Sequence, residues 1–248
     1  DWVGVEFDIL GPMRTTGMVR FLLLQSYPVL KLYVSPINID PTDPAVVISS
    51  PPELAAELAD EIGLFHTLGM PEETWSLNDG QISDADYLSM IRTTLAEREA
   101  MWYETLDAHN TELNVAVFVQ TDRVSHMFYR GMDEGHALYK ESSDETRGAV
   151  QWIYREADRI LGQTLERMSD DDQLIVLSDH GFAPFRKAVH LNRWLADAGY
   201  LAFKPGERGT DSLFEGVDWS KTSAFALGLN GLFVNQQGRE PQGLVSVE

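Results

Sequence analysis

The stretch Leu174–Phe185, which reads L-I-V-L-S-D-H-G-F-A-P-F, decides the fold. Its first part, Leu174–Leu177, is an unbroken apolar run, typical of a strand that is buried on both faces in a parallel sheet. The run stops at Asp179 and His180, and Gly181 permits a sharp turn directly after them. In open α/β sheets, ligands bind at this end of the strand, and a carboxylate beside an imidazole suits zinc or manganese. Taken alone, the pair is equally compatible with a polar loop.

A second apolar run, Asn114–Gln120, also ends in polar residues. Asp122 and His126 follow it at a spacing of one helical turn, so both side chains face the same way if the chain is helical after Asp122. Two such side chains can form half of a metal site. Taken alone, this pair favours a simpler interpretation, in which Asp122 caps a short helix and His126 is an exposed or core histidine.

The two runs are separated by an amphipathic helix, predicted over residues 143–168. The order strand, helix, strand predicts a right-handed crossover, which places Asp122 and Asp179 at the same edge of one parallel sheet. The two segments together give a stronger signal than either alone, because each delivers an Asp and a His to one place. The sequence therefore predicts a metal site of Asp122, His126, Asp179 and His180. Two cations about 4 Å apart at such a site can hold both oxygens of an in-line phosphoryl displacement.

The remaining pattern is that of an α/β protein. Residues 1–35 alternate in polarity and predict a small antiparallel β region, and the proline-rich residues 36–52 form a connector. A long helix is predicted over residues 83–110, where apolar residues recur at helical spacing. We therefore divide the chain into a β-rich subregion with its connector, residues 1–50, and a partial α/β domain, residues 51–248.

The composition limits the classes of function. The 248 residues carry a formal net charge of −20, which argues against broad electrostatic binding to nucleic acids or to anionic membranes. No run approaches the roughly 20 apolar residues that a membrane span requires. The chain contains no cysteine, so any metal must be held by Asp, Glu and His. We favour a cytoplasmic location, although the lack of cysteine does not settle the compartment.

Several motifs together resemble the type I phosphodiesterase/nucleotide pyrophosphatase family of the alkaline phosphatase superfamily. The resemblance covers nearly the whole chain, and its metal motifs are specific in combination because each alone is short. It rests on T-D-R-V-S-H-M-F-Y-R at 121–130 with Asp133, His136 and Tyr139, on S-D-H-G-F at 178–182, on Y-V-S-P-I-N-I-D-P at 33–41 and on A-L-G-L-N-G-L-F-V-N at 226–235.

The resemblance implies an alkaline-phosphatase-like fold with a mostly parallel sheet flanked by helices. It also implies a bimetallic hydrolase, usually with zinc and with manganese as the alternative, that cleaves phosphodiester or pyrophosphate bonds in a small phosphate ester or nucleotide. Asp179 and His180 match the ligands of one metal, and Asp122 and His126 match those of the other. In the family, a Thr or Ser attacks phosphorus and forms a covalent intermediate, which water then releases.

The chain departs from the family pattern at its ends. We find no match for the nucleophile or for the first metal Asp of the family, and the remaining family histidine ligand falls beyond the matching region. We therefore expect the nucleophile upstream of this sequence and expect the chain alone to be inactive. Two alternatives stay open. One is another enzyme of the superfamily, such as a phosphomonoesterase, sulfatase, phosphonate hydrolase or phosphoglycerate mutase. The other is a non-catalytic α/β module.

Other polar residues of the motifs have simpler interpretations. Arg123 and Arg130 are able to bind phosphate, but pairing with the many nearby acids is the favoured interpretation. His136 is able to touch a substrate, but stabilising the loop before Tyr139 is favoured.

Overall fold

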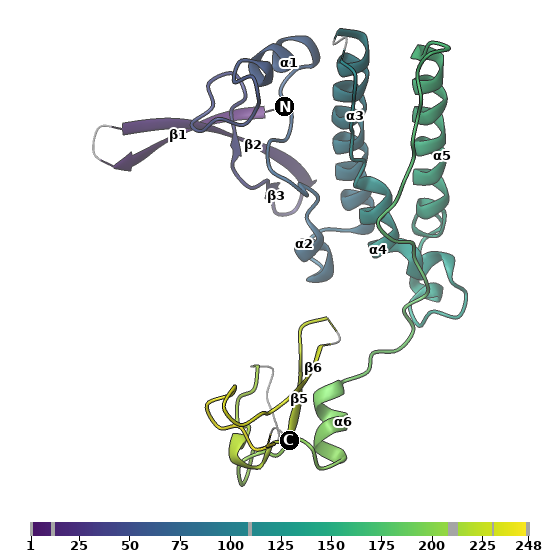
Figure 1. The fold of residues 1–248 in the computed structure, drawn as a ribbon. Coiled ribbons are helices and arrows are strands. Elements are labelled where there is room, and N and C mark those ends of the chain that lie inside the picture. The colour runs from purple at the N-terminus through teal and green to yellow at the C-terminus, as the bar shows by residue number, and fades with distance from the viewer. Residues whose placement is uncertain (1, 11–12, 109–110, 208–212, 230, 247–248) are drawn as a thin grey trace. The chain divides into compact units, whose positions relative to one another are not determined.

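A computed structural model describes residues 2–10, 13–108, 111–207, 213–229 and 231–246. The chain forms two compact units, Asp1–Arg186 (unit 1) and Lys187–Glu248 (unit 2) (Figure 1). The division that the sequence suggests at residue 50 falls inside unit 1. None of the helices described is both long enough and apolar enough to cross a membrane.

Unit 1 begins with an antiparallel sheet, as the alternation in residues 1–35 predicts. Strand β2 (Met13–Gln25) pairs with β1 (Trp2–Leu10), with β3 (Lys31–Val34) and with the short β4 (Asn38–Ile39). The Arg20 side chain of β2 pairs with Glu97 at 2.5 Å, which ties this sheet to the helices that follow it.

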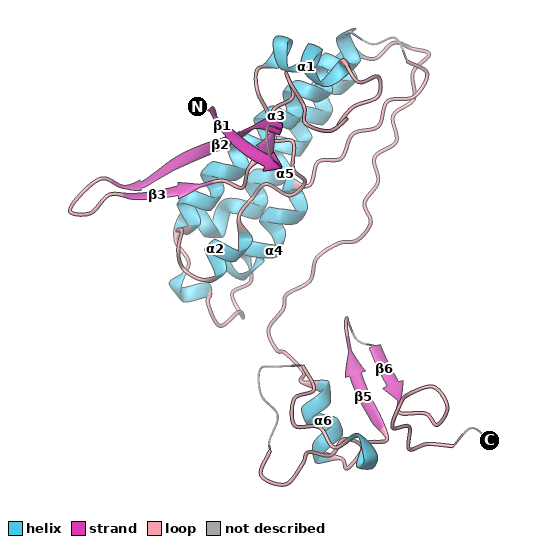
Figure 2. Ribbon diagram, turned by 90° about the vertical axis from the view of Figure 1, so that its left-hand side faces the viewer, coloured by secondary structure: helices cyan, strands magenta, loops and turns pink. Residues whose placement is uncertain are grey.

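The helices of unit 1 enclose its main core. They are α1 (Leu54–Ile62), α2 (Thr74–Asn78), α3 (Asp84–Ala108), α4 (Gln120–Met132) and α5 (Asp144–Arg167), with a 3-10 turn at Tyr139–Glu141. The long helices predicted near 83 and 143 are confirmed, and the predicted end of the first of these, near residue 110, lies outside the described residues. Figure 2 shows the helices gathered together below α1. The buried faces of α3, α4 and α5 meet in a cluster that includes Tyr87, Leu88, Ile91, Val124, Phe128, Val150 and Ile153.

Helices α3, α4 and α5 are joined at one point by Asp84. One oxygen of its carboxylate accepts a hydrogen bond from Arg130 of α4 at 2.7 Å, and the other accepts one from Thr146 of α5 at 2.8 Å. Beside this point, a Cβ on Gly131 would lie 2.9 Å from the Thr146 carbonyl oxygen, so glycine permits the close approach of α4 and α5.

The predicted parallel sheet is not confirmed. The Asn114–Gln120 and Leu174–Leu177 segments carry no strand in the described structure, and Gln120 is already the first residue of α4. The side chains of Ile175, Val176 and Leu177 are 75–82% exposed, so this run is not buried. A central strand needs a strand on each side, and the described residues form only small antiparallel sheets. The mixture of helices and strands fits the broad α/β class.

Unit 2 is a small α+β arrangement. Helix α6 (Leu191–Asp197) packs on the hairpin of β5 (Ala224–Leu227) and β6 (Gly231–Val234), with a 3-10 turn at Trp219–Lys221. The Asn192 side chain of α6 accepts from the backbone N–H of Ala226 at 2.7 Å and donates to its carbonyl at 2.9 Å, which fixes the helix to β5.

A buried carboxylate holds the first turn of α4. Glu72 is only 2% exposed, and its Oε1 accepts hydrogen bonds from Thr94 at 2.7 Å and from Gln120 at 3.2 Å. Its Oε2 lies 3.5 Å from Nε of Arg123, whose Nη2 donates to the Glu72 carbonyl oxygen at 2.9 Å. Because Gln120 and Arg123 belong to the first turn of α4, Glu72 fixes the position and direction of that turn.

We predict that Glu72→Ala destabilises the protein by about 3–5 kcal/mol, because it leaves the Arg123 guanidinium without its buried partner. Glu72→Gln, which keeps the shape of the side chain, should cost less. The free energy of unfolding from urea denaturation measures both. Exposed Glu61 on α1 is the control, and Glu61→Ala should change stability by less than about 0.5 kcal/mol. Equal stability of Glu72→Ala and Glu61→Ala would contradict the role given to Glu72.

Candidate metal centre

Helix α4 presents two of the predicted ligands from one face. Its apolar side chains Val124 and Phe128 are fully buried in the core, which leaves Asp122 and His126 on a more exposed face. Asp122 lies in the first turn and His126 one turn later, and their Oδ1 and Nε2 atoms are 3.2 Å apart. The chain is thus helical after Asp122, as required for the two side chains to act together.

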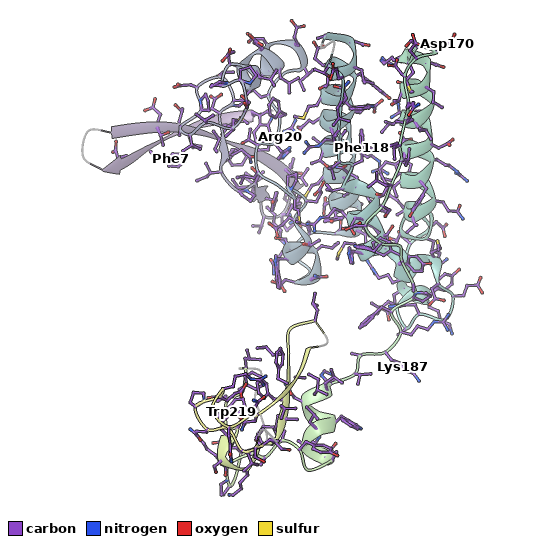
Figure 3. All side chains as sticks on the ribbon, in the orientation of Figure 1. Phe7, Arg20, Phe118, Asp170, Lys187 and Trp219 are labelled. Atoms are coloured by element: carbon purple, nitrogen blue, oxygen red, sulfur yellow. The ribbon has the colours of Figure 1, made fainter. Side chains whose placement is uncertain are left out.

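The second pair reaches α4 from the extended segment that follows α5. In Figure 3 the chain returns from Asp170, at one end of α5, and passes the other end of that helix before Lys187. His180 Nε2 lies 3.6 Å from Asp122 Oδ1 and 3.6 Å from Asp179 Oδ2. Ser178 Oγ donates to the His180 carbonyl, and the His180 N–H donates to Asp179 Oδ1, so the bend is held locally. The two motifs, separate in sequence, meet at α4.

Three of the four predicted residues form one group. A ligand atom of each of Asp122, His126 and His180 lies within 4.8 Å of the others. One carboxylate oxygen and two imidazole nitrogens form a donor set that fits zinc, and their side chains are 37–58% exposed, so one face stays open to a further ligand. Asp179 is not in the group, and its side chain is 87% exposed beside His180. The grouping therefore differs from the expected division, because His180 joins the Asp122 and His126 pair.

Phe182 also belongs to the site, although no sequence pattern assigns it a role. Its ring lies edge-on to His126 with 4.9 Å between centroids, edge-on to His180 at 5.4 Å, and stacked on Tyr129 at 6.4 Å. Its only signal in the sequence is its position two residues after His180. These contacts limit how far the two imidazoles can turn.

A cavity of about 580 Å³ opens beside the group. His126 is shared between the metal group and the cavity wall, so a molecule bound by the group can extend into the cavity. The wall is partly aromatic and apolar, and its residues include Leu77, Tyr129, His136, Leu138, Phe182 and Phe185. His136 also accepts a hydrogen bond through Nδ1 from the Leu138 N–H at 3.1 Å, which agrees with its expected loop-stabilising role.

The arginines around the site are paired with acids. Arg123 pairs with Glu72 and Arg130 with Asp84, which agrees with the favoured sequence interpretation. Arg186 contacts Asp133 with two nitrogens, at 2.7 and 2.5 Å, and these hydrogen bonds are the main reason that the pKa of Asp133 lies below its ordinary value. No local sequence pattern indicates this pair, because its two members are 53 residues apart in the chain.

The sequence model of a family described as type I phosphodiesterase / nucleotide pyrophosphatase matches residues 32–234, which include every residue of the metal group. No curated protein and no solved structure gives a significant match.

We predict that His126→Ala and His180→Ala each weaken zinc binding by more than about 100-fold, since the loss of a residue that only supports a ligand already costs 10–100-fold. Isothermal titration calorimetry of the chain with zinc measures this. His190, which precedes α6 in unit 2, is the matched control, and His190→Ala should leave the affinity unchanged. Zinc binding that survives both site substitutions would exclude this group as the metal centre.

Proposed function

Because the chain belongs to the type I phosphodiesterase/nucleotide pyrophosphatase family, we propose that it is part of a metal-dependent hydrolase that cleaves phosphodiester or pyrophosphate bonds at a two-metal site. One observation carries the proposal. Two motifs of the family, separated by the whole of α5, bring Asp122, His126 and His180 within reach of a single ion. A carboxylate oxygen and two imidazole nitrogens that converge on one point form a donor set of the kind that binds zinc.

The four predicted ligands are assigned to two metal ions. Asp122, His126 and His180 would hold one divalent cation, and Asp179, next to His180, would contribute to the second. Zinc is the favoured metal, because imidazole nitrogen and carboxylate oxygen are among its usual ligands, and manganese is the alternative. When bound, the ions supply positive charge that stabilises the developing charge on the phosphoryl oxygens.

The charge of the protein makes bound cations necessary for an anionic substrate. The formal net charge is −20, and the arginines nearest to the site are held by Glu72, Asp84 and Asp133. Little positive charge of the protein itself is therefore free to attract a phosphate. The cavity beside His126 has room for one organic substituent of a phosphodiester, so we propose a small phosphate ester or nucleotide as substrate.

The nucleophile is assigned to a Thr or Ser outside residues 1–248, as the family resemblance implies. The side chains that converge at α4 are metal-ligand types, and we give them no nucleophilic role. It follows that the chain alone should bind metal and phosphate without catalysing turnover, whereas the complete gene product should turn over.

We predict that the complete gene product hydrolyses bis(p-nitrophenyl) phosphate, and that chelation of its metal abolishes the reaction. Restoring zinc should restore the rate. Asp122→Ala should lower kcat/KM by at least about 100-fold, as expected when a group that stabilises the transition state is lost. Release of p-nitrophenol at 405 nm measures each rate.

Substrate preference separates the alternatives. Faster hydrolysis of p-nitrophenyl phosphate or of p-nitrophenyl sulfate than of the diester would instead indicate a phosphomonoesterase or a sulfatase. A complete gene product that binds no metal and hydrolyses none of the three esters would indicate a non-catalytic module.

A further inference from the structure

The segment that carries His180 lacks the backbone pairing that usually fixes a ligand. Residues 173–190 contain neither helix nor strand in the described structure. Among the described residues, only two side-chain pairs join residues 173–186 to the rest of unit 1 by a hydrogen bond or ion pair. One is His180 with Asp122, inside the metal group, and the other is Arg186 with Asp133. The second pair lies outside the group and is available to hold the segment before any metal binds.

The Asp133–Arg186 pair is built for a fixed geometry. Asp133 directly follows α4, and its side chain is only 10% exposed. Arg186 Nε and Nη2 donate to its two oxygens at 2.7 and 2.5 Å, which is the two-pronged arrangement that sets both distance and angle. The same carboxylate also accepts from the Gly135 N–H at 3.1 Å, so it is held in place from its own side.

Gly135 provides the space for the guanidinium. A Cβ at this position would lie 2.5 Å from Arg186 Cζ, which is closer than real contacts permit. The loop after α4 thus leaves room for Arg186 next to Asp133, and a side chain there would force the guanidinium away.

From these contacts we propose that Asp133 and Arg186 are positioning residues for the metal centre: their ion pair anchors the segment after α5 to the end of α4 and thereby sets His180 against Asp122 and His126. The inference rests on the proposed metal-dependent function. Neither residue is a ligand in the group, so their effect is exerted through the position of His180. Phe182 lies between His180 and Arg186 in the sequence. Its contacts with Tyr129 and with both imidazoles transmit the position of Arg186 to His180 and His126.

Charge and position predict opposite effects of removing Arg186. A cationic group near a metal site repels the incoming cation, so on electrostatic grounds alone Arg186→Gln should strengthen zinc binding. If Arg186 acts by positioning, the same substitution should weaken zinc binding, because ordering His180 then costs conformational entropy on binding. The direction of the change therefore distinguishes the two roles.

The first test is zinc titration of Arg186→Gln, with an expected loss of about 10–100-fold, the usual effect of removing a residue that orients a metal ligand. Arg186→Lys keeps the charge but not the two-pronged contact, so its affinity should be intermediate. Gly135→Ala should reproduce the loss without removing any charge. The matched control is Arg159→Gln, which breaks a similar two-pronged pair with Glu99, at 2.6 and 2.7 Å, between α5 and α3. It should leave zinc affinity unchanged.

The second test measures position without metal. Because the chain has no cysteine, spin labels can be attached specifically at Leu177→Cys, where Leu177 is 82% exposed, and at Tyr154→Cys on α5, where Tyr154 is 55% exposed. Double electron–electron resonance measures the distance between the two labels. The distance distribution should be narrow in the otherwise unchanged chain and in Arg159→Gln, and broad in Arg186→Gln. An unchanged distribution in Arg186→Gln would overturn the proposal, as would a broad distribution combined with unaltered zinc affinity.

The two tests separate this proposal from the proposed function. A chain that binds no zinc, but whose label distribution broadens on Arg186→Gln, would remove support for the metal-dependent function and still support the anchoring role of Asp133 and Arg186.

Discussion

Helix α4 is fixed at both ends by acid–arginine pairs, and the candidate metal centre depends on both. At its first turn, buried Glu72 holds Arg123 and Gln120, which sets the direction of Asp122. Just past its last turn, Asp133 holds Arg186 and with it the segment that carries His180. The Glu72–Arg123 pair is the more sensitive of the two to substitution. A buried carboxylate that loses its partners destabilises the fold, because its charge is then left desolvated and unpaired. Because the first turn of α4 is held in place, Asp122 keeps its position. His180 can then approach it from a segment that has no regular secondary structure.

The planar geometry of the guanidinium explains why arginine rather than lysine forms these pairs. An arginine presents several donors in one plane and can hold a carboxylate at two points, whereas lysine acts as a point charge. Glu72, Asp84 and Asp133 each bind an arginine within a chain of net charge −20, and each of these pairs holds a segment next to the site. The same pairing leaves the site itself dominated by carboxylate and imidazole, a surface that attracts metal cations before it attracts an anionic substrate.

The features that the sequence predicts correctly are those set by residues close together in the chain. The spacing of Asp122 and His126, the long helices and the family motifs depend on neighbours within a few positions, and the structure or the family match confirms them. The parallel sheet was not predictable in the same way, because apolar runs such as Leu174–Leu177 become strands only when other strands lie beside them. Phe182, Glu72 and Arg186 were missed for a related reason. Their roles come from contacts with residues far away in the chain, which no local pattern reveals.

Chain length accounts for the meeting of the two motifs without a sheet. Helix α5, with 24 residues, is about 36 Å long. The residues from Met168 to Asp179, fully extended, span about 40 Å, so they can return the chain along the length of α5 and little further. The start of α5 is packed against the end of α4 through Thr146 and Gly131. A segment that leaves the far end of α5 and is pulled back by Asp133 must therefore deliver His180 close to α4. The order of the elements and the matched lengths of helix and return segment bring the ligands into the same region, and the Asp133–Arg186 pair then sets His180 against Asp122 and His126.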